Sequence, residues 1–149
     1  MNDLLIRSGE CVAVCDGAKA LLLCNDGDAK FPNLKTVKVF TQEDLATREQ
    51  GTDAPGRAMN SVGGARSAVG QTDWHDQAEQ SFLARFVEYL DATAREGKIK
   101  SLIVVAPPRA LGVLRPAYTQ QLRSILRAEI DKDLVKLPVH VIEKHLTGA

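Results

Sequence analysis

Three arginines recur at a spacing of nine residues in a glycine-rich stretch, at Arg48, Arg57 and Arg66. The stretch covers about residues 46–72, has no clear hydrophobic period, and carries glycines at positions 51, 56, 63, 64 and 70. Glycine lets a backbone approach a ligand closely, and guanidinium groups beside exposed N–H groups suit phosphates or carboxylates. The pattern predicts an anion-binding loop. The alternative is a solvated or disordered loop without a role.

A second group of arginines lies in the C-terminal half of the chain. Arg109 directly follows an apolar run, inside the segment PPRALGVLR, and three more arginines follow at Arg115, Arg123 and Arg127. Such a basic patch could meet single-stranded nucleic acid, ribosomal RNA or an acidic protein. The alternative is a solvated helix face whose arginines pair with Glu129 and Asp131.

Trp74 and His75 lie where the glycine-rich stretch meets an expected helix. The tryptophan could stack on a base or close the edge of the core. The histidine lies near Asp73 and Asp76, an arrangement found around general bases. The spacing of the sequence places no serine or cysteine nucleophile beside it. The chain also has no phosphate-binding loop motif and no helical pair of histidines four residues apart. We therefore expect no catalytic residue, no metal and no cofactor.

The composition fits one soluble domain over residues 1–149. Lys plus Arg and Asp plus Glu both total 19, so the formal net charge is zero, and a globally basic nucleic-acid-binding protein is excluded. The apolar runs are too short to span a bilayer, and the N-terminus lacks the apolar segment of a secretory signal. We expect a cytoplasmic protein with no membrane contact. The sequence does not give its oligomeric state.

The N-terminal part reads as three strands. Residues 11–24 predict two strands around Asp16-Gly17, where the glycine would supply the positive φ of a tight hairpin turn, and residues 34–41 predict a third. The cysteines of this region are Cys11, Cys15 and Cys24. We expect them to be small buried residues in a reducing compartment, with Cys11 and Cys15 on one strand face.

The rest of the chain alternates helices and strands. A helix is predicted over 72–97, with Thr72 or Asp73 as its N-cap and Gly97 after its end. An apolar strand over 102–106 ends at two prolines. We expect a short turn or helix over 109–115, followed by a helix over 117–131 that begins with Pro116. A short strand over 132–136 and a closing helix over 138–146 should complete the chain.

This order predicts an α/β fold with a single mixed β-sheet flanked by helices. An N-terminal antiparallel meander would be joined by a parallel crossover strand. In such sheets the functional crevice lies beyond the carboxyl ends of the strands. Two loops are then candidates for the site, the glycine-rich loop and residues 107–112.

Several segments together resemble the bacterial host attachment proteins, which are labelled as required for attachment to host cells. They are REQGTDAPGR, SVGGARSAV, TDWH, IVVAPPRALGVLR and DLVKLP. The resemblance covers about residues 11–147. It implies a domain that influences bacterial attachment to host cells, through a protein partner or a small anionic ligand.

A more distant resemblance is to the middle domain of archaeal and eukaryotic peptide-chain release factors. There a glycine-rich loop ends in Gly-Gly-Gln before a long helix, and the glutamine helps water attack peptidyl-tRNA. This chain has Gly63-Gly64 followed by Ala65, and Ala106-Pro107 ends the strand after the helix. The resemblance implies binding to tRNA or the ribosome without hydrolysis, since Ala65 replaces the glutamine. A peptidyl-tRNA hydrolase that uses His75 or Gln71 is a further alternative.

These considerations assign the ligand- or RNA-binding role to nine residues. They are Arg48, Arg57, Gly63, Gly64, Arg66, Ser67, Trp74, His75 and Arg109.

Overall fold

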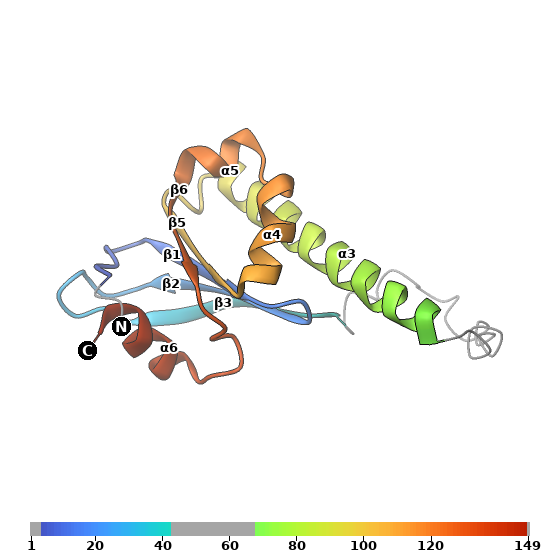
Figure 1. Cartoon of the computed structure of the whole chain (residues 1–149). Coiled ribbons are helices and arrows are strands. Elements are labelled where there is room, and N and C mark those ends of the chain that lie inside the picture. Colours follow the sequence, from blue (N-terminus) through green and yellow to red (C-terminus); the bar gives the residue numbers. More distant parts are fainter. Residues whose placement is uncertain (1–3, 43–67, 149) are drawn as a thin grey trace.

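The structure, a computed structural model, describes residues 4–42 and 68–148, with side chains from residue 76 onward in the second range (Figure 1). Its centre is a five-stranded sheet in the order β3-β2-β1-β5-β6. The strands are β1 (Cys11–Cys15), β2 (Lys19–Asn25), β3 (Leu34–Thr41), β5 (Leu102–Ala106) and β6 (Leu126–Asp131). The β3-β2-β1 part is antiparallel, and β1-β5-β6 is parallel. The predicted mixed α/β sheet is confirmed.

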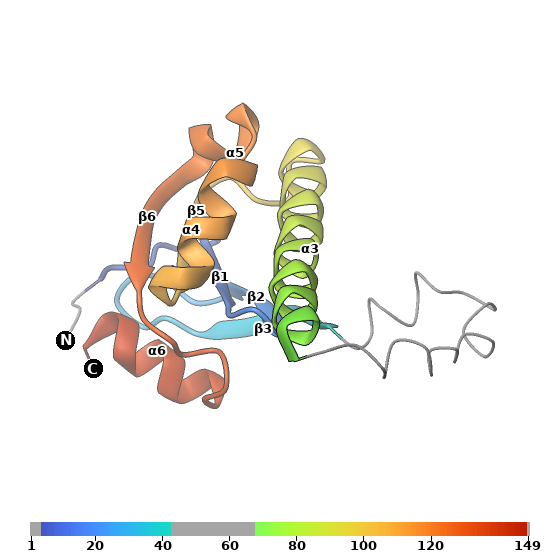
Figure 2. The ribbon, with the colours of Figure 1, turned by 45° about the vertical axis from the view of Figure 1, so that its right-hand side comes forward.

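The helices lie on both faces of the sheet (Figures 1 and 2). They are α3 (Ala68–Arg95), α4 (Pro108–Ala117), α5 (Gln120–Ile125) and α6 (Val139–Thr147). On one face, apolar side chains of α3, α4 and α5 form a core with alternate sheet residues, among them Phe82, Phe86, Leu111 and Leu122. On the other face, Ile142 and Leu146 of α6 pack on the remaining sheet residues. The all-buried strands β1 and β5 separate the two cores.

The β1–β2 hairpin forms as predicted, but its turn has a different basis. Asp16 N–H donates to the Lys19 carbonyl at 3.0 Å, and the Asp16 carboxylate accepts from the N–H groups of Ala18 and Lys19. Among the described residues the only positive-φ glycines are Gly9, Gly97 and Gly148. The expectation of a positive φ at Gly17 is therefore wrong, because the aspartate side chain holds the turn instead.

Helix α3 begins at Ala68, four residues before its predicted start. Thr72 and Asp73 lie within the helix and are not its N-cap, and the predicted loop over 46–72 ends correspondingly earlier. The other end is as expected: Gly97 has φ +80°, and Lys98 N–H donates to the Thr93 carbonyl. This pattern satisfies the last carbonyls of the helix.

The largest difference from the predicted elements lies at residues 116–136. Pro116 lies in the last turn of α4 and does not begin a helix. Thr119 caps the short α5 by accepting from Leu122 N–H, and the chain then leaves the helix to pair with β5 as β6. Residues 126–131 are thus a strand, because pairing with β5 overrides their helix-like apolar spacing. The strand predicted over 132–136 is absent from the described structure.

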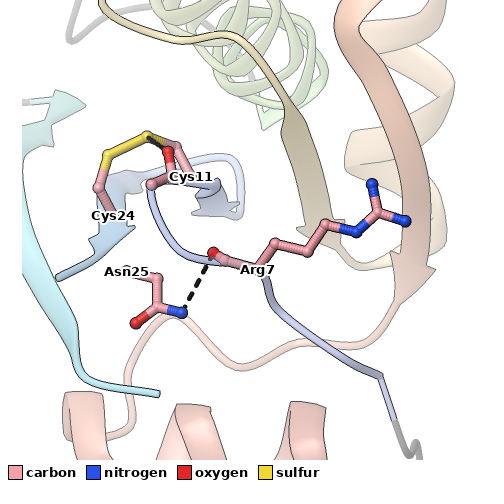
Figure 3. Close-up of a disulfide and its surroundings, with 5 residues drawn as sticks. Arg7, Cys11, Cys24 and Asn25 are labelled. Carbon is pink, nitrogen blue, oxygen red and sulfur yellow. Dashed lines mark hydrogen bonds between the residues drawn. A yellow bond between two sulfur atoms is a disulfide. The ribbon is translucent and has the colours of Figure 1, made fainter. Parts of the chain in front are cut away.

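A disulfide joins Cys11 to Cys24, which face each other across β1 and β2 (Figure 3). The expectation of three reduced thiols is therefore wrong for these two residues. Their opposite positions in the antiparallel register bring the Cα atoms within 4.0 Å. Cys15 remains a free, buried thiol, and burial raises its pKa to about 12, helped by the charge of Asp16.

A buried carboxylate joins three elements at the start of β1. Glu10 is 2% exposed and accepts from Arg127 of β6 at 2.5 and 2.9 Å. It also accepts from the Ser101 hydroxyl at 2.6 Å and from Arg7 N–H at 3.0 Å. Burial alone would raise the pKa of Glu10, but these hydrogen bonds and the Arg127 charge lower it below the usual range.

Thiol labelling tests the disulfide. In denaturant without reductant, one thiol per chain, that of Cys15, should react with an alkylating reagent, and after reduction all three cysteines should react. Reduction should also lower the free energy of unfolding by about 3 kcal/mol, since the bond closes a short loop. Three reactive thiols in unreduced protein would show that the bond is absent.

The Glu10→Gln variant tests the buried carboxylate. It should lose about 1–3 kcal/mol of stability, because a neutral amide accepts weaker hydrogen bonds than the charged carboxylate does. The pKa of Glu10 is lowered on folding, so its contribution is present above the unfolded pKa and is lost as pH falls through the folded value. Urea unfolding between neutral and acid pH measures both effects. The exposed Glu96→Gln is the control, with a change of about 0.5 kcal/mol or less.

Candidate functional site

A cleft lies at the edge of the sheet where β1 and β5 end. Because these neighbours are parallel, the residues after them, Asp16 and Pro107, meet at the same edge. The cleft has a volume of about 310 Å³. Its lining consists of Asp16, Gly17, Ala18, Glu79, Leu83, Pro107, Arg109, Ala110, Val113 and Lys136. This carboxyl-edge cleft matches the crevice expected beyond the strand ends.

Arg109 reaches into the cleft from the first turn of α4. Its guanidinium contacts the carboxylate of Asp76 and that of Glu79, the latter at 3.2 Å. The two acids are three residues apart on α3, so they share one helix face. Arg109 remains 68% exposed. The contacts join α4 to α3 but contribute modestly to stability, as exposed ion pairs do.

Gly17 allows Glu79 to lie over the β1–β2 turn. A Cβ atom added at Gly17 would come within 2.7 Å of Glu79 Cδ. The turn glycine therefore serves the approach of this side chain rather than a special backbone angle.

The carboxyl-edge cleft has no excess of positive charge. Asp16 and Glu79 oppose Arg109 and Lys136, and Asp76 adds a further negative charge at the rim. The described residues thus offer no positive excess to a phosphate. An anion that binds in the cleft must displace the carboxylates of Asp76 and Glu79 from Arg109, or its charge must be neutralised by cations from outside the cleft.

The structure brings only part of the predicted site into view. Arg109 lines the cleft. Trp74 and His75 lie in helix α3, but the structure describes only their backbone and not their side chains. The other predicted site residues lie outside the described residues altogether: Arg48, Arg57, Gly63, Gly64, Arg66 and Ser67. Sequence reasoning did not assign Asp16, Asp76, Glu79 and Lys136 to the site. The three-residue spacing of Asp76 and Glu79 could have indicated an acidic pair.

The C-terminal arginines do not form one helix face. Arg115 of α4 pairs with Glu129 at 2.9 Å, as the alternative to a basic patch predicted. Glu129 and Arg127, however, belong to β6 rather than to a helix. The Tyr118 hydroxyl also donates to Glu129 at 2.8 Å. Burial and this hydrogen bond raise the pKa of Tyr118, so the hydroxyl stays protonated.

Two features that sequence reasoning considered have no counterpart in the described part of the chain. None of its helices has both the length and the apolar character that a bilayer span requires. No three side chains of His, Cys, Asp or Glu gather there as the ligands of a metal ion would.

Comparison with known proteins relates the chain to a release factor family. The model of bacterial archaeo-eukaryotic release factor family 12 matches residues 10–146. An uncharacterized protein of Rickettsia prowazekii (strain Madrid E) is 36% identical over 70 residues, which are 47% of this chain and 45% of the relative. A crystal structure of the archaeal translation termination factor aRF1 is similar over 93% of this chain and 35% of that chain, with 13% identity and a TM-score of 0.48. The chain spans less than half the length of each of these two proteins.

Neutralising the partners of Arg109 tests the charge balance of the cleft. The double variant Asp76→Asn, Glu79→Gln should bind inorganic phosphate about tenfold more tightly than the parent, because Arg109 is released. Its stability should change by about 1 kcal/mol or less. Titration calorimetry at low salt and urea unfolding measure the two effects. The exposed Glu88→Gln on the same helix is the control. Unchanged phosphate affinity in the double variant would contradict this account of Arg109.

Proposed function

Because the chain belongs to bacterial archaeo-eukaryotic release factor family 12, we propose that residues 1–149 act as one cytoplasmic, translation-related domain. It binds tRNA or the ribosome and does not cut its ligand. The family match over residues 10–146 is the observation that carries this proposal. The contacts to RNA would be made by the glycine- and arginine-rich loop, together with Arg109.

The positions of the loop's neighbours support this assignment. At the end of β3, Gln42 donates from its backbone to the Ala18 carbonyl and from its side chain to the Gly17 carbonyl. Both acceptors line the carboxyl-edge cleft. After the loop, α3 begins at Ala68 and reaches the same cleft at Glu79. These two residues are separated by about 16 Å along the helix axis. The chain thus leaves the described structure beside the cleft and re-enters it in a helix that passes the cleft.

The charge of the cleft decides how RNA would be held. Its described residues carry no positive excess, so Arg48, Arg57 and Arg66 of the loop must supply the phosphate contacts. Arg109 is exposed and could exchange its carboxylates for a phosphate without a large loss of stability. Ala65 stands where the resembling factors have glutamine, which favours binding over hydrolysis.

A second candidate is a small anionic ligand, for which the carboxyl-edge cleft has the volume and Arg109 is the exposed cation. A cleft of about 310 Å³ with both signs of charge can hold a small polar molecule. A role in attachment to host cells would then be exerted through such a ligand or a protein partner.

The double variant Arg57→Gln, Arg66→Gln tests the RNA proposal. It should lower affinity for tRNA or ribosomes, and the salt slope of log K should shrink by about 0.7–0.9 for each lost phosphate contact. Filter binding to tRNA and co-sedimentation with ribosomes over a range of salt measure this. Exposed Arg95→Gln at the far end of α3 is the matched control.

Binding is measured with the Cys11–Cys24 disulfide both oxidised and reduced, because cysteines in the cytoplasm are mostly reduced.

Four results would count against this function. Binding that does not depend on salt, or that the double variant retains, would exclude the loop arginines as phosphate ligands. Nuclease-resistant capture of a protein that depends on Arg57 and Arg66 would favour the attachment role. Turnover of peptidyl-tRNA that is lost with His75 and Gln71 would favour a hydrolase.

A further inference from the structure

A second hollow, of about 550 Å³, lies along the outer edge of β6. Its lining consists of Arg115, Tyr118, Arg123, Leu126, Arg127, Ala128 and Glu129. The last four are consecutive residues of β6. Leu126 packs against the core under α4 and α5, whereas Ala128 packs against the core under α6, because the register shift lies between them. A hollow lined by residues of both sheet faces opens at the edge of the strand, where backbone groups are exposed. We call it the edge groove.

The strand that lines this groove is an edge strand, and its regular part begins inside the groove, at Ala128 and Glu129, and continues beyond it to Asp131. β6 is the last strand in the sheet order and pairs with β5 on one side only. Among the described residues, no other strand pairs with its outer edge. The register shift places Arg127 between the pairs Leu102–Leu126 and Ile103–Ala128, and pairing is regular from Ala128 to Asp131. This regular part can accept a further strand.

The charge of the edge groove favours an anionic occupant. Three arginines line it against one carboxylate, that of Glu129. Arg115 is paired with Glu129, and Arg127 with the buried Glu10. Arg123 is exposed and donates to the Arg115 carbonyl at 3.3 Å, and within the described residues it has no carboxylate partner. Arg123 is therefore the cation that can take an acidic group from outside.

The same residues disfavour single-stranded nucleic acid. Such ligands stack their bases on exposed aromatic rings, but the ring of Tyr118 packs against the core beneath α4 and α5. Its hydroxyl is held by Glu129. An extended peptide needs no stacking platform, and it can use the backbone groups of β6.

We propose that an acidic peptide segment in an extended conformation binds the edge groove as an added strand on β6, with a carboxylate on Arg123. This site is separate from the carboxyl-edge cleft and does not depend on the RNA-binding proposal. Backbone hydrogen bonds along Ala128–Asp131 supply affinity, and Arg123 selects for acidic sequence.

The test uses a synthetic peptide of alternating valine and glutamate, about six residues long as strands commonly are. It should bind the intact protein, and a peptide of alternating valine and lysine should not. Amide signals of residues 126–131 should shift in the NMR spectrum of the labelled protein, and their hydrogen exchange should slow. Arg123→Glu should weaken binding about tenfold or more. Lys30→Glu makes the same charge change on the β2–β3 loop and should leave affinity unchanged.

Each contrary result would overturn the proposal. Equal affinity of Arg123→Glu and Lys30→Glu would show that Arg123 selects nothing. Signal changes at the carboxyl-edge cleft instead of β6 would place the peptide elsewhere. Competition by a short single-stranded RNA, or concentration-dependent dimers that block the peptide, would assign the groove to nucleic acid or to a second copy of this chain.

Discussion

The parallel half of the sheet depends on one buried carboxylate. Glu10 lies just before the central strand β1 and has lost almost all contact with water. A carboxylate in that position is stable only if its oxygens are fully bonded, and the donors come from three places: Arg127 of β6, Ser101 before β5, and the backbone of Arg7. The network therefore fixes where β5 and β6 start relative to β1. The register shift in β6 has a role here, since the extra residue it accommodates is Arg127 itself.

Much of the fold was predictable from local patterns. The buried strand at Leu102–Ala106 and the strong turn at Asp16 were identified because apolar runs and turn residues act over a few positions. The region 117–131 was not predictable in this way, because its apolar residues fit one continuous helix as well as the observed short helix followed by a strand. These residues are Leu122, Ile125, Leu126 and Ile130. There the secondary structure is determined by pairing with β5, a contact between distant parts of the sequence that local propensity does not reflect. The Cys11–Cys24 pair is an intermediate case: a turn at residues 16–19 implies a register that places these cysteines opposite each other.

The sequence predicted that a crevice would lie beyond the strand ends, where the carboxyl-edge cleft is found. The rule that parallel sheets bind at their carboxyl ends identified Arg109 and the loop before α3 as candidates. It could not say that Arg109 would meet Asp76 and Glu79, since that contact depends on how α3 crosses the sheet. Arg109 is therefore not a free cation that awaits a phosphate, because Asp76 and Glu79 already neutralise its charge. The described residues of the cleft therefore offer no positive excess to a phosphate.

The place of β1 in the sheet also has a consequence during synthesis. The first strand made is the central one, and Cys11 to Val14 face β5 residues that are translated much later. At ordinary rates of elongation the emerging β3-β2-β1 meander waits on the order of ten seconds with that apolar edge unpaired. The disulfide between β1 and β2 cannot cover that edge, and the long helix α3 is translated before β5 can pair with it. The nascent chain is therefore most open to aggregation, and to chaperones that bind exposed strands, in the interval before β5 leaves the ribosome.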